Sequence, residues 1–264
     1  MKASSMSQVW KWLKVPYEYL VLYVGLFIFG VMSLSWSLPA TILYPLLPRR
    51  TGASLGQFVI MIVFRIYLFI LRASGLVKCD LSALDALRHE GALIIAPNHP
   101  SLIDVVLVAS RLPRIVGIMK AKIWDNLLLG GGARLAGYIR NDSHASMIRL
   151  AAAAMHTNSQ LLVFPEGTRT RLSPLNPFKG GFALIAKTAG IPIQTVFIEA
   201  NTPFLGKGWP LLKKPEFPLI YRARLGQRFE VKGDVKTFVA ELEQYFQQQP
   251  EIRNFHPFNT PPDL

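Results

Sequence analysis

The sequence predicts an α/β protein, in which a layered sheet with flanking helices follows an N-terminal helical membrane anchor. Three observations lead to this fold class. Short apolar runs alternate with helical stretches over 76–264, long apolar segments occupy 1–75, and hydrophobic residues make up 51% of the 264 positions. A chain of this size and composition can fold around its own hydrophobic core without disulfides or metals.

The segment 1–75 is expected to form a membrane-associated helical hairpin. No charged residue occurs in 20–47, and a helix over 20–38, just before Pro39, would extend about 28 Å, close to the thickness of a bilayer core. A cleaved signal peptide is one alternative, but this apolar run is longer than the hydrophobic region of most signal peptides. A buried core helix of a soluble protein is the other alternative.

The second apolar run, 58–71, is interrupted by Arg65. At about 100° per residue, Ser54, Arg65 and Arg72 fall on one narrow arc of a helix and leave the remaining surface apolar. Gln57 lies at the edge of this arc. The pattern favours a helix that lies in the membrane interface.

The basic residues of this segment bear on how the hairpin meets the membrane. Two full spans would place Arg49 and Arg50 in the translocated loop while the N-terminal lysines stay inside, which the positive-inside tendency disfavours. We therefore prefer a shallow or re-entrant hairpin to a true two-span hairpin. In either arrangement the N-terminus and the body lie on the cytoplasmic side.

The body is expected to begin near residue 76 as alternating strands and helices. Apolar runs bounded by Gly, Pro or polar residues predict buried strands at 92–96, 115–119, 161–164 and 193–198. Helices are predicted between them at 102–110, 143–157 and 182–189. This alternation is typical of a layered sheet with parallel strands.

A later strand is predicted at 219–225, and an amphipathic helix follows it. We expect the apolar face of that helix to pack on the body. The face consists of Val235, Phe238, Val239, Leu242 and Phe246. The tail after Gln249 contains four prolines and is expected to be irregular or mobile.

Lysine and arginine number 29 against 16 aspartates and glutamates, and the resulting net charge of +13 indicates an anionic partner. The positive charge flanks the apolar segments and the aromatic residues do not alternate with basic stripes, so a phospholipid surface is favoured and nucleic acid is disfavoured. The single Cys79 excludes an intrachain disulfide and a cysteine-cluster metal site, and it fits a reducing compartment. No metal is expected, because the histidines lack the spacing of metal ligands.

Candidate catalytic residues follow the first of the predicted buried strands, where the chain reads Asn98-His99-Pro100 and Asp104 follows. Pro100 steers His99 away from helical dihedral angles and itself suits the first position of a helix. His99 therefore precedes the helix while Asp104 lies inside it, which allows the two side chains to meet. A carboxylate bonded to one imidazole nitrogen fixes the tautomer and leaves the other nitrogen as a general base. An ordinary capped helix start is the alternative.

A second group of polar residues follows the predicted strand at 161–164. It supplies one carboxylate, a flexible glycine, two hydroxyls and two guanidiniums: Glu166, Gly167, Thr168, Arg169, Thr170 and Arg171. Together these can hold an anionic head group, and phosphate is the expected ligand. A solvated turn is the alternative. Lys120 and Arg140 are further candidates for the same anion, although each alone is more often a surface charge.

In this order, the segments resemble the 1-acylglycerol-3-phosphate acyltransferase family, the PlsC-like glycerolipid acyltransferases. The first family block is complete in Asn98, His99 and Asp104, and the third is complete in 164–169. The second block resembles 137–140. Lys120 corresponds to a family lysine upstream of that block, and Lys122 is the less favoured register.

The fourth block resembles 191–197, although Gln194 and Thr195 depart from the usual valine-proline pattern. The segment 178–181 also resembles the family's sequence between blocks three and four. The resemblance covers about 76–200 of the chain.

The resemblance implies transfer of a fatty acyl group from a thioester, either acyl-carrier protein or acyl-CoA, to the hydroxyl of a lysophospholipid such as 1-acylglycerol-3-phosphate. It makes His99 the general base and Asp104 the residue that orients it. It places further residues at the acceptor and its phosphate: Glu166, Gly167, Thr168, Arg169, Arg140 and Lys120. The donor is a co-substrate, and no cofactor is implied.

No acyl-enzyme is required, because Cys79 stands outside every block and Ser101 lacks the pattern of a nucleophile elbow. We expect the enzyme at a bacterial inner membrane, with its catalytic domain on the cytoplasmic face and membrane lipids as partners. One alternative is the same chemistry on an amino-acid lyso-lipid or a specialised lipid or polyene product, for which Gln194 and Thr195 leave room. Another is a catalytically idle basic protein that binds membranes or nucleic acid.

Overall fold

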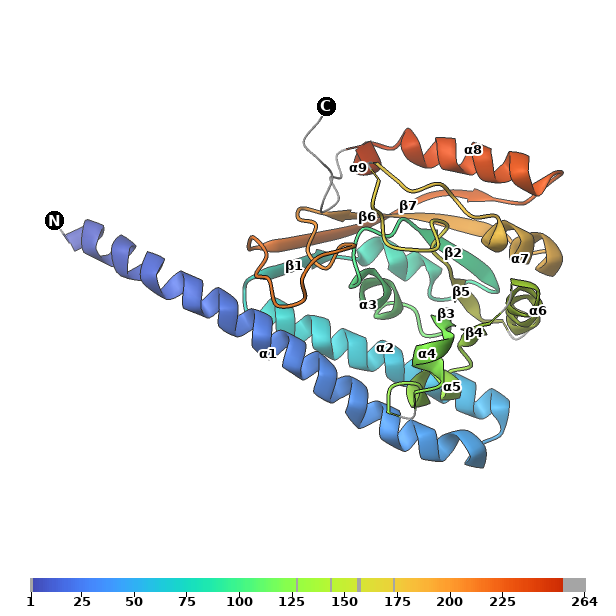
Figure 1. Ribbon diagram of the computed structural model, residues 1–264, viewed down its shortest axis with the longest axis horizontal. Coiled ribbons are helices and arrows are strands. Elements are labelled where there is room, and N and C mark those ends of the chain that lie inside the picture. Colours follow the sequence, from blue (N-terminus) through green and yellow to red (C-terminus); the bar gives the residue numbers. More distant parts are fainter. Residues whose placement is uncertain (1, 127, 143, 156–157, 173, 254–264) are drawn as a thin grey trace.

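The computed structural model describes residues 2–126, 128–142, 144–155, 158–172 and 174–253. Two long helices, α1 (Lys2–Leu46) and α2 (Arg49–Ala73), form a hairpin that lies along one side of an α/β body (Figure 1). The body begins with the strand β1 (Val77–Asp80), a few residues after α2 ends.

Helix α1 continues through Pro39, contrary to the prediction of an apolar helix that ends before this proline. A proline inside a helix removes one hydrogen bond and usually breaks or kinks the helix. Here the body holds α1 on both sides of Pro39. Ser37 Oγ accepts a hydrogen bond from the Gly131 backbone N–H at 3.1 Å, and Thr41 Oγ1 accepts one from Arg134 at 3.4 Å. Tertiary contacts therefore keep the helix continuous.

The described residues form a seven-stranded sheet in the order β1-β7-β6-β2-β5-β3-β4. Neighbouring strands are parallel, except that β6 and β7 are antiparallel. The strands after β1 are β2 (Leu93–Pro97), β3 (Ile115–Lys120), β4 (Ile139–Asn141), β5 (Gln160–Leu162), β6 (Ile193–Ala200) and β7 (Leu219–Phe229). The predicted α/β sheet is confirmed, and the short strands β1 and β4 are added at its two edges.

Helices cover both faces of the sheet (Figure 1). One face carries the hairpin and α3 (Asp104–Ala109), and the other carries α6 (His144–Met155), α7 (Gly181–Ala189) and α8 (Val235–Gln247). The shorter helices are η1 (Ser82–Leu87), α4 (Ala121–Trp124), α5 (Gly131–Leu135) and α9 (Pro250–Arg253).

Strand β2 lies between two hydrophobic cores. Ile95 packs in the core that includes Leu71 of the hairpin, whereas Ile94 packs in the core that includes Phe246 of α8. Successive side chains of a strand point to opposite faces, so a strand covered on both faces must be apolar throughout. This explains the uninterrupted apolar run that predicted β2.

The C-terminal tail begins with the helix α9, contrary to the prediction of an irregular tail after Gln249. Ile252 is fully buried in the core that contains Phe246, and this contact fixes the short helix against the body. The remainder of the predicted tail, 254–264, lies outside the described residues.

Part of the polar arc of α2 contacts the body rather than water. Gln57 Nε2 donates to the carbonyl of Ala136 at 3.0 Å, and Arg65 Nε donates to the carbonyl of Ser110 at 3.3 Å. Ala136 and Ser110 directly follow α5 and α3, where carbonyl groups lack partners within the helix. Gln57 and Arg65 therefore cap the C-terminal ends of α5 and α3, whether or not the rest of the arc contacts a membrane interface.

Gly56 and Gly30 provide a matched test of how tightly the hairpin packs. A Cβ at Gly56 would lie 2.5 Å from the backbone nitrogen of Ala136, whereas a Cβ at Gly30 would meet nothing within 4 Å. Gly56→Ala should lower the free energy of unfolding by about 1–3 kcal/mol through overpacking. Gly30→Ala should raise it by about 0.5–1 kcal/mol through helix propensity. Thermal unfolding in detergent measures both changes, and equal midpoints for the two variants would contradict the close packing.

Candidate active site

His99 and Asp104 meet at the carboxyl end of β2. His99 Nδ1 lies 2.9 Å from Asp104 Oδ2, and the exposed fractions of the two side chains are 13% and 0%. The same carboxylate oxygen accepts the backbone N–H of Ser101 at 2.8 Å, which fixes its orientation. Burial raises the pKa of Asp104, and the hydrogen bond from His99 opposes this shift. Because Nδ1 is held by the carboxylate, Nε2 is the nitrogen that remains for a substrate proton.

The segment after β5 reaches His99 because β2 and β5 are neighbouring parallel strands, whose carboxyl ends meet at one edge of the sheet. The ring of Phe164 stacks on the imidazole of His99, with centroids 3.7 Å apart and an interplanar angle of 17°. The Thr170 backbone N–H donates to the carbonyl of His99 at 2.8 Å. The two sequence blocks therefore form one site.

Glu166 binds both segments through buried hydrogen bonds. Its Oε1 accepts the backbone N–H of His99 at 3.0 Å and the hydroxyl of Thr170 at 2.9 Å, and its Oε2 accepts the backbone N–H of Asn176 at 3.0 Å. Only 1% of Glu166 is exposed, and burial raises its pKa. This geometry favours a positioning role for Glu166 over the direct contact with an acceptor that we predicted.

Gly167, Thr168 and Arg169 form the turn that follows Glu166. Gly167 has φ of +67°, which favours glycine, and a Cβ there would lie 2.8 Å from the side chain of Lys179. Thr168 and Arg169 are partly exposed. The turn therefore presents a hydroxyl and a guanidinium next to His99.

The structure gives the other two predicted cations different surroundings. Lys120 ends β3 with an exposed side chain, and its charge acts on Lys207, as do those of Arg169 and Arg171. Arg140, on β4, is instead paired with two carboxylates. Its Nε lies 3.0 Å from Asp125, and it also bonds to Asp142, so that both carboxylates raise its pKa. Lys120 is thus a charged neighbour of Lys207, while the charge of Arg140 is already neutralised.

Sequence reasoning missed Lys207, whose Nζ lies 3.2 Å from Thr168 Oγ1. Burial lowers the pKa of Lys207, and three neighbouring cations lower it further: Arg171, Arg169 and Lys120. Lys207 lies between two glycines in an irregular segment and outside every recognised block, so no local signal marks it. The stacking partner Phe164 was present in a block, but the pattern did not indicate its role.

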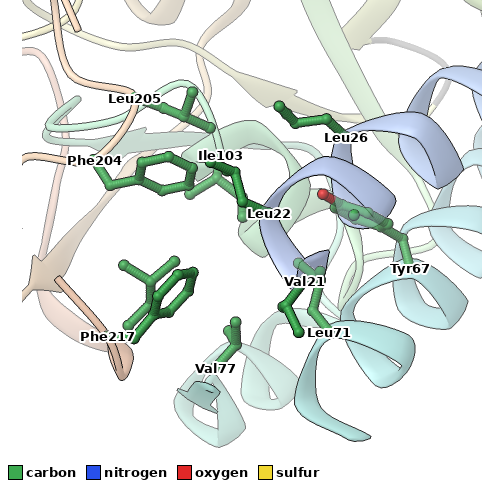
Figure 2. A pocket seen from close by; sticks show the side chains of 12 residues that line it. Val21, Leu22, Leu26, Tyr67, Leu71, Val77, Ile103, Phe204, Leu205 and Phe217 are labelled. Atoms are coloured by element: carbon green, nitrogen blue, oxygen red, sulfur yellow. The ribbon is translucent and has the colours of Figure 1, made fainter. Parts of the chain in front are cut away.

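An apolar pocket of about 40 Å³ lies beside the site, between the hairpin and the body. Figure 2 shows Val21 and Leu22 of α1 on one side of this space and Phe204 and Phe217 on another. Ile103, directly before Asp104, also lines it. The apolar pocket therefore reaches the residue next to Asp104 in the chain.

Neither Cys79 nor Ser101 is an activated nucleophile. Burial raises the pKa of the Cys79 thiol to about 11, so the thiol is protonated near neutral pH. Ser101 is buried, and its hydroxyl donates to the carbonyl of Phe204 at 2.7 Å. Among the described residues, no three His, Cys, Asp or Glu side chains gather in a group that could hold a metal ion.

Comparison with known proteins agrees with the family resemblance. A family model described as "Acyltransferase" matches residues 78–199. The chain is 39% identical over 111 residues to a 1-acyl-sn-glycerol-3-phosphate acyltransferase of Cocos nucifera, a match that covers 39% of this chain and 36% of the coconut protein. This chain thus spans little more than a third of the length of that relative.

The name of a second relative specifies a different acceptor. The chain is 29% identical over 195 residues to a lyso-ornithine lipid O-acyltransferase of Pseudomonas aeruginosa, and the match covers 69% of each protein. Among solved structures, PlsC from Thermotoga maritima has a TM-score of 0.61 at 17% identity, covering 84% of this chain and 91% of that one. At this identity the structural likeness establishes the fold.

Replacing Glu166 tests its positioning role. Glu166→Gln places an amide NH₂ where the structure needs a second acceptor oxygen, so we expect the free energy of unfolding to fall by about 1–3 kcal/mol. Hydrogen exchange at the His99 amide should accelerate. Glu241→Gln, at an exposed position on α8, is the matched control and should change neither measurement. If the two variants behave alike in thermal unfolding and hydrogen exchange, Glu166 does not hold the site together.

Proposed function

Because residues 78–199 match the acyltransferase family model, we propose that the chain is a membrane-associated glycerolipid acyltransferase. It moves a fatty acyl group from acyl-carrier protein or acyl-CoA to the hydroxyl of a lysophospholipid such as 1-acylglycerol-3-phosphate. The observation that supports this most strongly is the contact of 2.9 Å between His99 and the buried Asp104, beside a turn rich in cations.

In the proposed reaction, His99 Nε2 takes the proton of the acceptor hydroxyl as that oxygen attacks the thioester carbonyl. The new C–O bond forms, the C–S bond breaks, and the proton passes to the departing thiolate. Asp104 stabilises the imidazolium that exists between these steps and holds the ring in the required orientation. The stacked ring of Phe164 restricts the remaining rotation of the imidazole.

Direct attack by the acceptor is the simplest route, because neither available nucleophile suits a covalent intermediate. With a pKa of about 11, the Cys79 thiol contains roughly one thiolate in a thousand at pH 8. The Ser101 hydroxyl is buried and committed to the carbonyl of Phe204. The proposal therefore uses no acyl-enzyme and no cofactor besides the thioester donor.

The head group of the acceptor is assigned to the turn after Glu166. Thr168 and Arg169 would contact its phosphate, and Lys120 would add a third contact across the site. Gly167 gives the turn its left-handed backbone conformation, and the side chain of Lys179 packs where a Cβ of residue 167 would stand. Arg140 is a weaker candidate than the sequence suggested, because Asp125 and Asp142 already hold it.

An amino-acid lyso-lipid is a second candidate acceptor, and the relative from Pseudomonas aeruginosa favours it. The residues of the fourth block give it no further support. Gln194 Nε2 donates to the carbonyl of Gly226 at 2.7 Å, and Thr195 Oγ1 donates to the carbonyl of Gln227 at 2.7 Å. Both side chains therefore join β6 to β7, and their departure from the family pattern concerns the packing of the sheet.

We also propose that the hairpin lies in the membrane interface, with the body on the cytoplasmic side. Both hairpin helices are long and apolar enough to cross a membrane. However, α1 contacts the body from Glu18, which pairs with Lys214 at 2.5 Å, to Thr41, which bonds to Arg134. These residues are about 35 Å apart along a helix. A helix fastened to the body over that length favours an interfacial arrangement over two full spans.

Removing the imidazole tests the chemistry. In purified protein reconstituted with lipid, His99→Ala should lower acyl transfer at least about 100-fold, because a positioned general base contributes a factor of this size or larger. His89→Ala is the matched control, since His89 is exposed, and it should retain full activity. Substantial transfer by His99→Ala would refute the mechanism. Wild-type protein that binds vesicles but transfers no acyl group would favour the catalytically idle alternative.

The same assay assigns the substrates. Acyl-carrier-protein and CoA thioesters are each combined with 1-acylglycerol-3-phosphate and with a lyso-ornithine lipid. We expect the phosphate acceptor to be used at least about tenfold more efficiently, because the turn presents cations to a ligand of opposite charge. A preference for the ornithine lipid would replace the leading acceptor by the second one.

The exposed face of the hairpin can be tested separately from catalysis. Phe27 on α1 and Phe69 on α2 are 71% and 70% exposed. Replacing both by Ser should weaken binding to anionic vesicles at least about tenfold, because each buried phenylalanine contributes roughly 1.5–3 kcal/mol. Leu184→Ser, on α7 at the opposite face of the sheet, is the control and should leave vesicle flotation unchanged. Unchanged binding of the double variant would place the membrane contact elsewhere.

A further inference from the structure

The segment 201–218, between β6 and β7, crosses the candidate site although it lies beyond the part of the chain that the family model matches. Its residues 204–206 are fastened to both sequence blocks. Ser101 Oγ donates to the carbonyl of Phe204 at 2.7 Å, and the Leu102 backbone N–H donates to that of Leu205 at 3.0 Å. Arg169 Nη1 donates to the carbonyls of Leu205 and Gly206, at 2.7 and 2.9 Å. The next residue is therefore held in a defined position.

That next residue is Lys207. Its ammonium lies 3.2 Å from the hydroxyl of Thr168, a residue of the turn assigned to the head group. Arg169, Arg171 and Lys120 are its charged neighbours. Among the described residues, no aspartate or glutamate forms an ion pair with any of these four cations.

Like charges held close together repel one another, and an anion placed among them removes that repulsion. Arg140 shows the contrasting case in the same chain, because two carboxylates of the protein neutralise it. The four cations around Lys207 form no such ion pairs within the described residues, although the charge of Asp104 acts on Arg169. An anionic ligand would therefore relieve their mutual repulsion.

We propose that Lys207 binds the phosphate of the acceptor's head group and determines specificity for a phosphate monoester. This inference rests on the proposed acyltransferase function. Lys207 supplies a compact point charge from a segment outside the recognised blocks, and the guanidinium of Arg169 bonds to the two residues directly before Lys207. The anion would thus meet two cations. A phosphate monoester carries up to two negative charges and matches this surrounding. The head of a lyso-ornithine lipid carries one carboxylate and one ammonium, and the ammonium would be repelled.

The position of the segment 204–207 also fits an amphiphilic acceptor. Phe204 and Leu205 line the apolar pocket beside α1, as Figure 2 shows, while Lys207 bonds to Thr168 in the polar part of the site. One short segment therefore borders both the charged and the hydrocarbon environment that a lysophospholipid requires.

Steady-state kinetics of Lys207 variants tests this proposal. Lys207→Gln should raise KM for 1-acylglycerol-3-phosphate about 10- to 100-fold, as expected for the loss of a charged contact, while kcat stays within about threefold. Lys207→Arg should restore KM to within about threefold of wild type. Lys213→Gln removes the same charge from an exposed position in the same segment and is the matched control, with unchanged KM.

Comparing two acceptors shows whether the variant loses activity only with the phosphate acceptor or with both. In Lys207→Gln, the ratio of kcat/KM for the phosphate acceptor to that for a lyso-ornithine lipid should fall at least about tenfold. If thermal unfolding shows that Lys207→Gln is destabilised, Lys207→Met, which keeps an unbranched side chain, takes its place. An unchanged KM, or a kcat that falls while KM stays constant, overturns the role of Lys207. Failure of the wild-type protein to use any acceptor would instead overturn the proposed function.

Discussion

The hydrogen bond from the His99 backbone to the buried carboxylate of Glu166 is the interaction on which the candidate site depends. It joins the segment after β2 to the segment after β5, which the parallel sheet brings to one edge but does not itself connect. Because Glu166 accepts three hydrogen bonds at once, the stacking of Phe164 on His99 and the path of the cationic turn follow from the same contact. A buried carboxylate is costly unless its oxygens are satisfied, and here satisfying them specifies a single arrangement of the two segments.

Much of this arrangement could be predicted from the sequence, because its signals are local. The apolar runs and their boundaries predict the central strands, and Pro100 predicts that His99 precedes the helix that carries Asp104. The features that were missed depend on contacts between distant residues. Strands β1 and β4 are only four and three residues long and carry no pattern of their own. The carboxylates that neutralise Arg140 come from other parts of the chain, and α1 continues past Pro39 because α5 holds it. The buried orientation of the Glu166 side chain could not be predicted either, because the motif identifies the residue and does not show where its side chain points.

The hairpin and the catalytic body form one packed unit. Leu22 of α1 and Leu71 of α2 belong to the same hydrophobic core as Leu107 of α3, the helix that begins with Asp104. The segment 201–218 adds two polar connections, because Lys214 pairs with Glu18 of α1 while Lys207 bonds to Thr168 in the site. A lipid that enters from an interface along the hairpin would therefore not need to carry its hydrocarbon chain through water, at a cost of about 0.8 kcal/mol per methylene.

The distribution of positive charge indicates where on this unit an anionic group would bind. A net charge of +13 could in principle be spread evenly, but the structure treats its cations in two ways. Arg140 and Arg111 are neutralised by aspartates of the protein, and these pairs require nothing from outside. The cations around Thr168 form no ion pairs among the described residues, and the turn that carries Thr168 is joined to His99 by the Thr170 backbone N–H. In the proposed function, an anionic group bound there would place the rest of its molecule next to His99. The same electrostatic arrangement would then bind the acceptor and determine which of its groups reaches the base.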